Sequence, residues 1–190
     1  DFLWILPLTI TAFHVRKPLI AGFTYGLACA VKQEPWILLP FLITWTWRAL
    51  GDERREKLVA TTRFLASAVF AFLLPNIFFI LKNPRSWWTD IMTPLSGDLI
   101  VISQGISTIT QMGLVPISRT FYVTLAVAVL LLLLFQYNLH FRELKHAIWT
   151  FPAVIMWFSP RGLQNYFVYL IPVCLAAAVT LYQEHRGDPS

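Results

Sequence analysis

Long apolar stretches separated by short polar ones dominate the chain and predict a bundle of helices. The apolar stretches cover residues 2–15, 19–31, 36–47, 64–81, 121–137, 147–158 and 166–182. At about 1.5 Å of rise per residue, a helix of a dozen residues covers roughly 18 Å of a hydrocarbon core about 30 Å thick. The pattern therefore predicts an all-α fold, a polytopic transmembrane bundle in which short, interrupted helices stand beside longer ones.

The most unusual polar position interrupts the apolar run from 18 to 47, where residues 32–35 read Lys-Gln-Glu-Pro. Ionisable residues at membrane depth are costly, so they indicate a function by default. Pro35 lacks a backbone donor and its ring clashes with the preceding turn, so it cannot continue a helix. We expect two half-length helices that meet at a polar tip near one face of the bilayer. A second interruption at 159–162, after the short stretch 147–158, is expected to face the same way.

Composition strengthens the membrane interpretation. Hydrophobic residues make up 57% of the chain and charged residues 13%, with a mean hydropathy of +0.61, whereas soluble domains carry about 25% charged residues. We therefore expect an integral, multi-pass membrane protein of the cell membrane. Asp1 leads almost at once into an apolar stretch, so we expect 1–190 to be a single membrane domain, the C-terminal portion of a longer polytopic chain. Cys29 and Cys174 lie inside apolar stretches and are interpreted as small buried hydrophobes.

The basic residues predict an orientation, because cytoplasmic loops carry the excess of Lys and Arg. If every stretch crosses, most of the 15 basic residues share the inner side: Arg16, Lys17, Arg48, Arg54, Arg55, Lys57, Arg63, Arg142, Lys145 and Arg186. The outer side then holds Lys32, Lys82, Arg85, Arg119 and Arg161. Topology thus explains the net charge of +5, and this disfavours nucleic acid as a partner.

The long outer connection, 82–120, differs from the two inner ones. Residues 85–92, with two tryptophans, suit a short helix lying in the membrane interface. A connection of this length with apolar content of its own is usually functional, and Gln104 in its second half could contact an acceptor. The inner stretches 51–57 and 140–146 carry charges of both signs and are predicted to be solvated turns.

A family resemblance rests on short motifs. Ala21-Gly22 through Gly26-Leu27-Ala28, then Lys32, Pro35 and a Leu-rich run to Pro40, resembles the integral membrane mannosyltransferases of the GT-C superfamily that use polyprenyl-phosphate mannose. Asn83-Pro84 leading to Gln104-Gly105, and Ser159-Pro160-Arg161 before Tyr166, are similar to later parts of such chains. The resemblance implies transfer of a hexose, mannose in that family, from a polyprenyl-phosphate donor to a lipid or glycan acceptor at the outer membrane face.

The resemblance also implies a catalytic acidic residue in the first outer loop, which would lie before Asp1. Within the chain, Asp98 is a weak catalytic candidate. Lys32, with Gln33 and Glu34 beside it, would bind the donor phosphate, helped by the helix that begins at Pro35. Arg161 would add a forked second contact. Attack by an acceptor hydroxyl needs a carboxylate base and inverts the anomeric carbon in a single displacement.

Each assignment has a structural alternative. Lys32 could pair locally with Glu34 at two helix ends, Arg161 could anchor a helix at the headgroups, Asp98 could be a turn residue, and Gln104 could bond within its own loop. The four histidines all fall on the predicted inner side, so no metal ligands are assigned at the outer site. No cofactor is established, and a divalent metal is left open. Two other functions remain: a secondary transporter with broken helices, or a non-catalytic membrane subunit with packed, salt-bridged breaks.

Overall fold

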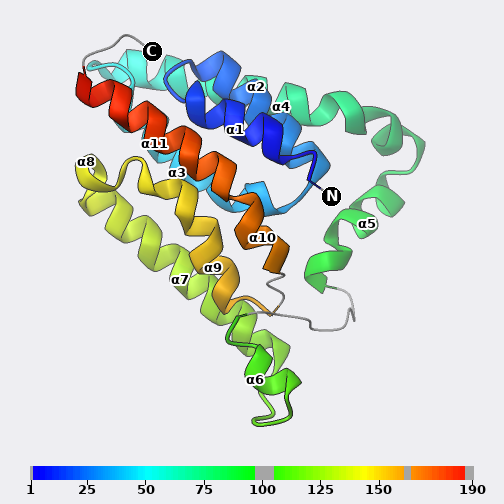
Figure 1. Cartoon of the computed structure of the whole chain (residues 1–190). Coiled ribbons are helices and arrows are strands. Elements are labelled where there is room, and N and C mark those ends of the chain that lie inside the picture. Colours follow the sequence, from blue (N-terminus) through cyan, green and yellow to red (C-terminus); the bar gives the residue numbers. More distant parts are fainter. Residues whose placement is uncertain (1, 97–104, 161–163, 187–190) are drawn as a thin grey trace.

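The computed structural model describes residues 2–96, 105–160 and 164–186, and every element in these residues is helical (Figure 1). The first half of the chain contains α1 (Ile5–Phe13), α2 (Pro18–Val31), the 3-10 helix η1 (Glu34–Leu38), α3 (Leu39–Ala49), α4 (Arg54–Lys82) and α5 (Pro84–Ser96). The second half contains α6 (Thr108–Gln111), α7 (Arg119–Leu139), α8 (Phe141–Leu144), the 3-10 helix η2 (Ala147–Thr150), α9 (Phe151–Phe158), α10 (Gln164–Tyr169) and α11 (Ile171–Arg186). The all-α fold class predicted from the apolar pattern is confirmed.

Three helical segments of the described residues are long and apolar enough to cross a membrane: Arg54–Lys82, Arg119–Leu139 and Phe167–Glu184. Large apolar side chains such as Phe70, Leu131 and Leu175 are exposed on them, and a hydrocarbon environment would cover such surfaces. Pro18–Val31 and Ala147–Phe158 are apolar but shorter, as the sequence predicted. The structure therefore supports a membrane protein with long and half-length helices side by side.

The predicted break at 32–35 is present. α2 ends at Val31, Lys32 adopts an extended conformation (φ −151°, ψ 154°), and a new helix begins at Glu34. Pro35 occupies the first turn of η1, where its missing N–H is not needed. η1 runs directly into α3, so the two half-length helices are α2 and the η1–α3 unit.

Two boundary predictions are wrong. The charged stretch 51–57 is a turn only to Glu53, because a capping box between Glu53 and Glu56 starts α4 at Arg54. The apolar stretch 166–182 is divided between two helices, α10 and α11, which meet at Leu170. Pro172 lies in the first turn of α11, and a proline there cannot continue the preceding helix. The helix predicted at 85–92 is present as part of α5, and the inner stretch 140–146 includes one helical turn, α8.

The tightest helix contact joins α2 to α4. A Cβ added at Gly22 would lie 2.2 Å from the carbonyl oxygen of Phe64, and one at Gly26 would lie 2.1 Å from that of Ala68. Glycines spaced four apart let two membrane helices approach backbone to backbone. The glycines that carry part of the family resemblance therefore have a packing role that fixes the helix leading to the break.

The turns predicted as inner gather at one end of the bundle, the left end in Figure 1, where the α1–α2 turn, the α3–α4 turn, α8 and the end of α11 lie together. We call this the basic end and define it by Arg16, Arg48, Arg55, Arg142 and Lys145. η1 and α5 lie away from it (Figure 1). The described chain thus has a basic end and an opposite end that carries the break.

Candidate functional site

The break between α2 and η1 is braced by side chains on both sides. The Tyr25 hydroxyl, on α2, donates to the carbonyl oxygen of Pro35 over 3.1 Å. In return the indole N–H of Trp36 donates to the carbonyl oxygen of Cys29 over 3.0 Å. Carbonyls in the last turn of a helix lack partners within it, so Trp36 satisfies one of them. The polar tip is therefore held in a defined shape.

Lys32 and Glu34 are close but not tightly paired. The Lys32 ammonium lies 4.0 Å from Oε1 of Glu34, and the side chains are 25% and 14% exposed. Within the part of the chain that the structure describes, Oε2 of Glu34 is buried and accepts no hydrogen bond. A buried carboxylate oxygen without a partner costs free energy. Glu34 thus has capacity for one further donor, such as a hydroxyl group.

Gln33 has a structural partner outside the break. Its amide Nε2 donates to the carbonyl oxygen of Ile91 on α5 over 3.1 Å. This bond ties the tip to the helix of the outer connection. Gln33 was predicted to bind substrate, and in the structure one of its two amide N–H donors is used by this bond.

α5 is docked beside the break by contacts that the sequence did not reveal. The indole N–H of Trp87 donates to Oδ1 of Asn76 over 3.0 Å. Trp36, Phe72 and Trp87 form an edge-to-face series, with ring centroids 6.1 and 6.3 Å apart. From the sequence, Trp87 was assigned to the membrane interface and not to a contact with α4. The sequence feature that could have indicated this contact is Asn76, a polar residue directly after Pro75 inside an apolar stretch. These contacts place an amphipathic helix against the tip.

The second interruption is tied to the outer connection as well. α9 ends at Phe158, and the Ser107 hydroxyl lies 3.3 Å from the carbonyl oxygen of Ser159 and 3.4 Å from that of Pro160. Gly105 packs so closely that an added Cβ would meet the Trp157 carbonyl at 2.0 Å. η1 also packs against α9. The two interrupted elements therefore belong to one contiguous part of the bundle.

Three predicted site residues, Asp98, Gln104 and Arg161, lie outside the described residues. The convergence of Arg161 with Lys32 on one phosphate, the contact of Gln104 with an acceptor and the catalytic role of Asp98 therefore stay predictions. Lys32, Gln33 and Glu34 are brought together at the break, with α5 and α9 as neighbours. No group of three or more metal-ligating side chains occurs among the described residues.

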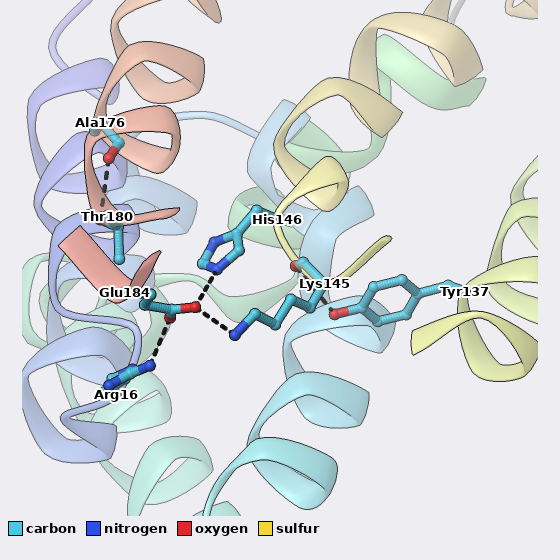
Figure 2. Close-up of polar contacts among 7 residues, drawn as sticks. All are labelled: Arg16, Tyr137, Lys145, His146, Ala176, Thr180 and Glu184. Atoms are coloured by element: carbon cyan, nitrogen blue, oxygen red, sulfur yellow. Dashed lines mark hydrogen bonds and ion pairs between the residues drawn. The ribbon is translucent and has the colours of Figure 1, made fainter. Parts of the chain in front are cut away.

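A second charged cluster, at the basic end, was missed by the sequence reasoning (Figure 2). Oε2 of Glu184, near the end of α11, forms hydrogen bonds with Lys145 Nζ and with His146 Nε2, the latter at 3.1 Å. Its Oε1 forms an ion pair with Arg16 Nη2 at 2.8 Å and accepts no hydrogen bond in the described structure. The buried Tyr137 on α7 supports this segment by donating to the carbonyl oxygen of Lys145 over 3.4 Å. Burial lowers the pKa of His146 from 6.5, although the hydrogen bond to Glu184 opposes that shift. One carboxylate thus joins three chain segments.

Two cavities open at the basic end. One, of about 480 Å³, lies between Arg16 and the first turns of α4 and includes Arg55 and Arg63. The other, of about 540 Å³, lies between α3 and α8. Arg16 and Leu50 line both cavities.

Comparison with protein-family models, curated proteins and solved structures gave no match for this chain.

Proposed function

We propose that the chain belongs to an integral membrane glycosyltransferase that moves a hexose, with mannose as the first sugar to test, from a polyprenyl-phosphate donor to a lipid or glycan acceptor at the outer membrane face. The observation that carries the proposal is the pair of charged side chains at the break, Lys32 and Glu34. An ammonium group and a carboxylate with an unsatisfied buried oxygen lie 4.0 Å apart at the break, beside apolar residues of η1 and α3.

The donor has a phosphate, which suits the Lys32 ammonium, and sugar hydroxyl groups, which suit the Glu34 carboxylate. The Lys32 ammonium would contact the phosphate, which becomes the leaving group when the bond between the anomeric carbon and the phosphate oxygen breaks. Oε2 of Glu34 would accept a hydrogen bond from a sugar hydroxyl and so remove its own unsatisfied state. Arg161 would provide a second contact to the phosphate. The proton of the acceptor hydroxyl would pass to a carboxylate base as the new glycosidic bond forms.

The apolar surroundings suit the lipid part of such a donor. η1 and α3 present exposed or half-buried apolar side chains near the tip, among them Ile37 and Leu39. α5, which Gln33 ties to the tip, is amphipathic and suits a position along the membrane surface. A polyprenyl chain could lie in the hydrocarbon region while its phosphate reaches Lys32.

A non-catalytic membrane subunit is the second candidate, and one observation favours it. The break is braced by the Tyr25, Gln33 and Trp36 hydrogen bonds, which is the arrangement expected of a packed structural joint. Under this alternative, the Lys32–Glu34 pair would only balance two helix ends.

Sugar transfer by the Lys32→Ala variant separates the two candidates. The full-length protein in native membranes is supplied with labelled polyprenyl-phosphate mannose, and transfer to endogenous acceptors is measured. A hydrogen bond to a charged group is worth about 1.5 to 3 kcal/mol, so we expect kcat/KM to fall by roughly 10- to 100-fold. Lys82→Ala is the matched control, because Lys82 is exposed at the end of α4.

Equal transfer by the Lys32 and Lys82 variants would exclude the phosphate role. If the wild-type protein, with its expression verified, moves no hexose from any polyprenyl-phosphate donor, the glycosyltransferase proposal fails and the structural role is favoured.

A further inference from the structure

The cavity between α3 and α8 has a lining of unusual charge. Its polar walls are formed by Arg16, Arg142 and Lys145, and its apolar walls include Trp45, Leu50 and Phe141. No carboxylate lines it among the described residues. Its volume of about 540 Å³ lies in the range of roughly 300 to 1,000 Å³ that ligand sites occupy.

The charges around this cavity do not balance. Glu184 is shared by Arg16 and Lys145, and Arg142 is exposed and forms no ion pair within the described part of the chain. Three cations against one carboxylate leave a surplus of two positive charges. His146, the third contact of Glu184, adds little charge at neutral pH because burial lowers its pKa. Glu143 is exposed on α8 and does not line the cavity.

The cavity also lies at a defined depth. α4 begins at Arg54, α7 ends at Leu139 directly before α8, and α11 ends at Arg186, so the ends of the three longest apolar segments surround this end of the bundle (Figure 1). The ends of membrane-crossing helices lie at the level of the lipid headgroups. Basic pockets between membrane helices at this level suit the phosphate groups of anionic lipids.

We propose that the α3–α8 cavity binds the headgroup phosphate of an anionic phospholipid from the leaflet at the basic end. The guanidinium of Arg142 would bind the phosphate directly, with Lys145 and Arg16 adding charge from the side held by Glu184. Phe141 and Leu50 would contact the glycerol and the first carbons of the acyl chains. The proposal is independent of the glycosyltransferase function, because the cavity lies at the end of the bundle away from the break.

The test measures binding of defined lipids to the purified full-length protein in neutral detergent, by native mass spectrometry. Three probes are used: short-chain phosphatidylglycerol, short-chain phosphatidylcholine and inorganic phosphate. We expect retention of phosphatidylglycerol at least 10-fold above phosphatidylcholine, and weakening with added salt because part of the contact is exposed. Inorganic phosphate should compete only at much higher concentration, because it lacks the apolar contacts.

Variants locate the site. Arg142→Ala should weaken phosphatidylglycerol binding about 10-fold, in line with the loss of one charge-assisted contact. Arg142 has no ion pair to lose within the described residues, so folding should be preserved. Arg54→Ala is the matched control, because Arg54 is exposed at the same end and lines neither cavity.

Three results would overturn the proposal. Equal retention of the two lipids would exclude recognition of the anionic headgroup. Equal weakening by the Arg54 and Arg142 substitutions would show diffuse surface attraction without a site. Competition by inorganic phosphate at the concentration of the lipid would show a free-phosphate site and exclude the lipid.

Discussion

The break and the basic end each place a carboxylate near cations, yet the ion-pair contacts of the two carboxylates differ in number and distance. Glu184 is 9% exposed and has basic side chains at 2.8 and 3.1 Å as well as Lys145. Glu34 is 14% exposed, and its ion-pair partner Lys32 lies 4.0 Å away. Each carboxylate has one buried oxygen without a hydrogen bond in the described structure, Oε2 of Glu34 and Oε1 of Glu184, but Oε1 of Glu184 lies 2.8 Å from the Arg16 guanidinium. Similar burial therefore accompanies two different degrees of pairing.

This difference separates a structural role from a binding role. A buried carboxylate with three close basic neighbours fixes the segments that contact it, whereas one with a single long ion pair retains capacity for a ligand. Glu184 joins the α1–α2 turn, the segment before η2 and α11, which are remote in sequence. The ion-pair partner of Glu34 is Lys32, two residues before it in the chain. A ligand could therefore contact Glu34 without separating packed helices.

The largest expected effect is the loss of stability in Glu184→Gln. The substitution keeps the shape of the side chain but removes the charge that holds Arg16, Lys145 and His146. Removing one partner of a buried pair costs about 3 to 5 kcal/mol. We expect about 2 to 3 kcal/mol here, because Arg16 is 46% and Lys145 27% exposed. The measurement is the free energy of unfolding in mixed detergent micelles.

Glu143→Gln is the control for that measurement, since Glu143 is exposed on α8 beside the cluster and should change stability by less than about 0.5 kcal/mol. If Glu184→Gln matched this control, the cluster would not be the joint that we describe.

A smaller effect on stability is expected for Glu34→Gln. The neutral amide loses a long, partly exposed ion pair, worth at most about 1 kcal/mol. It also removes the cost of a buried, unpaired carboxylate oxygen, so the net change in unfolding free energy should stay within about 1 kcal/mol. Sugar transfer, by contrast, should fall by roughly 10-fold as the contact to the sugar hydroxyl weakens.

Asp90→Asn is the matched control at this end of the bundle, because Asp90 is exposed on α5 and should leave both stability and transfer unchanged. A Glu34 variant that unfolds as easily as the Glu184 variant, or that transfers sugar normally, would remove the distinction between the two carboxylates.

The sequence predicted the break but not the cluster, and the reason is the distance along the chain between interacting residues. Pro35 ends the helix by a local effect that is legible from residues 32–35 alone. Glu184 meets residues 16, 145 and 146, and no local pattern specifies which basic residue it will contact. The docking of Trp87 on Asn76 was hidden for the same reason.

The glycine motif of α2 shows a different limit. Gly22 and Gly26 carry part of the family resemblance, and their close contacts with the Phe64 and Ala68 backbone give them a packing role in this chain. The helix boundaries at Arg54 and Leu170 were misplaced because a capping box and a proline act within one turn, whereas the apolar stretches define helices only coarsely.

The smallest effect expected is a pH dependence of the basic end. The pKa of His146 is lowered from 6.5 in the folded protein, mainly by burial. As the pH falls below 6.5, this imidazole therefore takes up a proton in the unfolded chain before it does so in the folded chain. Stability then decreases with falling pH, because the unfolded state carries more protons. Between pH 7.5 and 5.5 we expect the wild-type protein to lose stability, and His146→Gln to lose less. The control is a substitution of the exposed His140, on the turn before α8, to Gln. An unchanged slope in the His146 variant would mean that this imidazole does not report on the Glu184 cluster, and the comparison of the two carboxylates would then depend on the two glutamate substitutions alone.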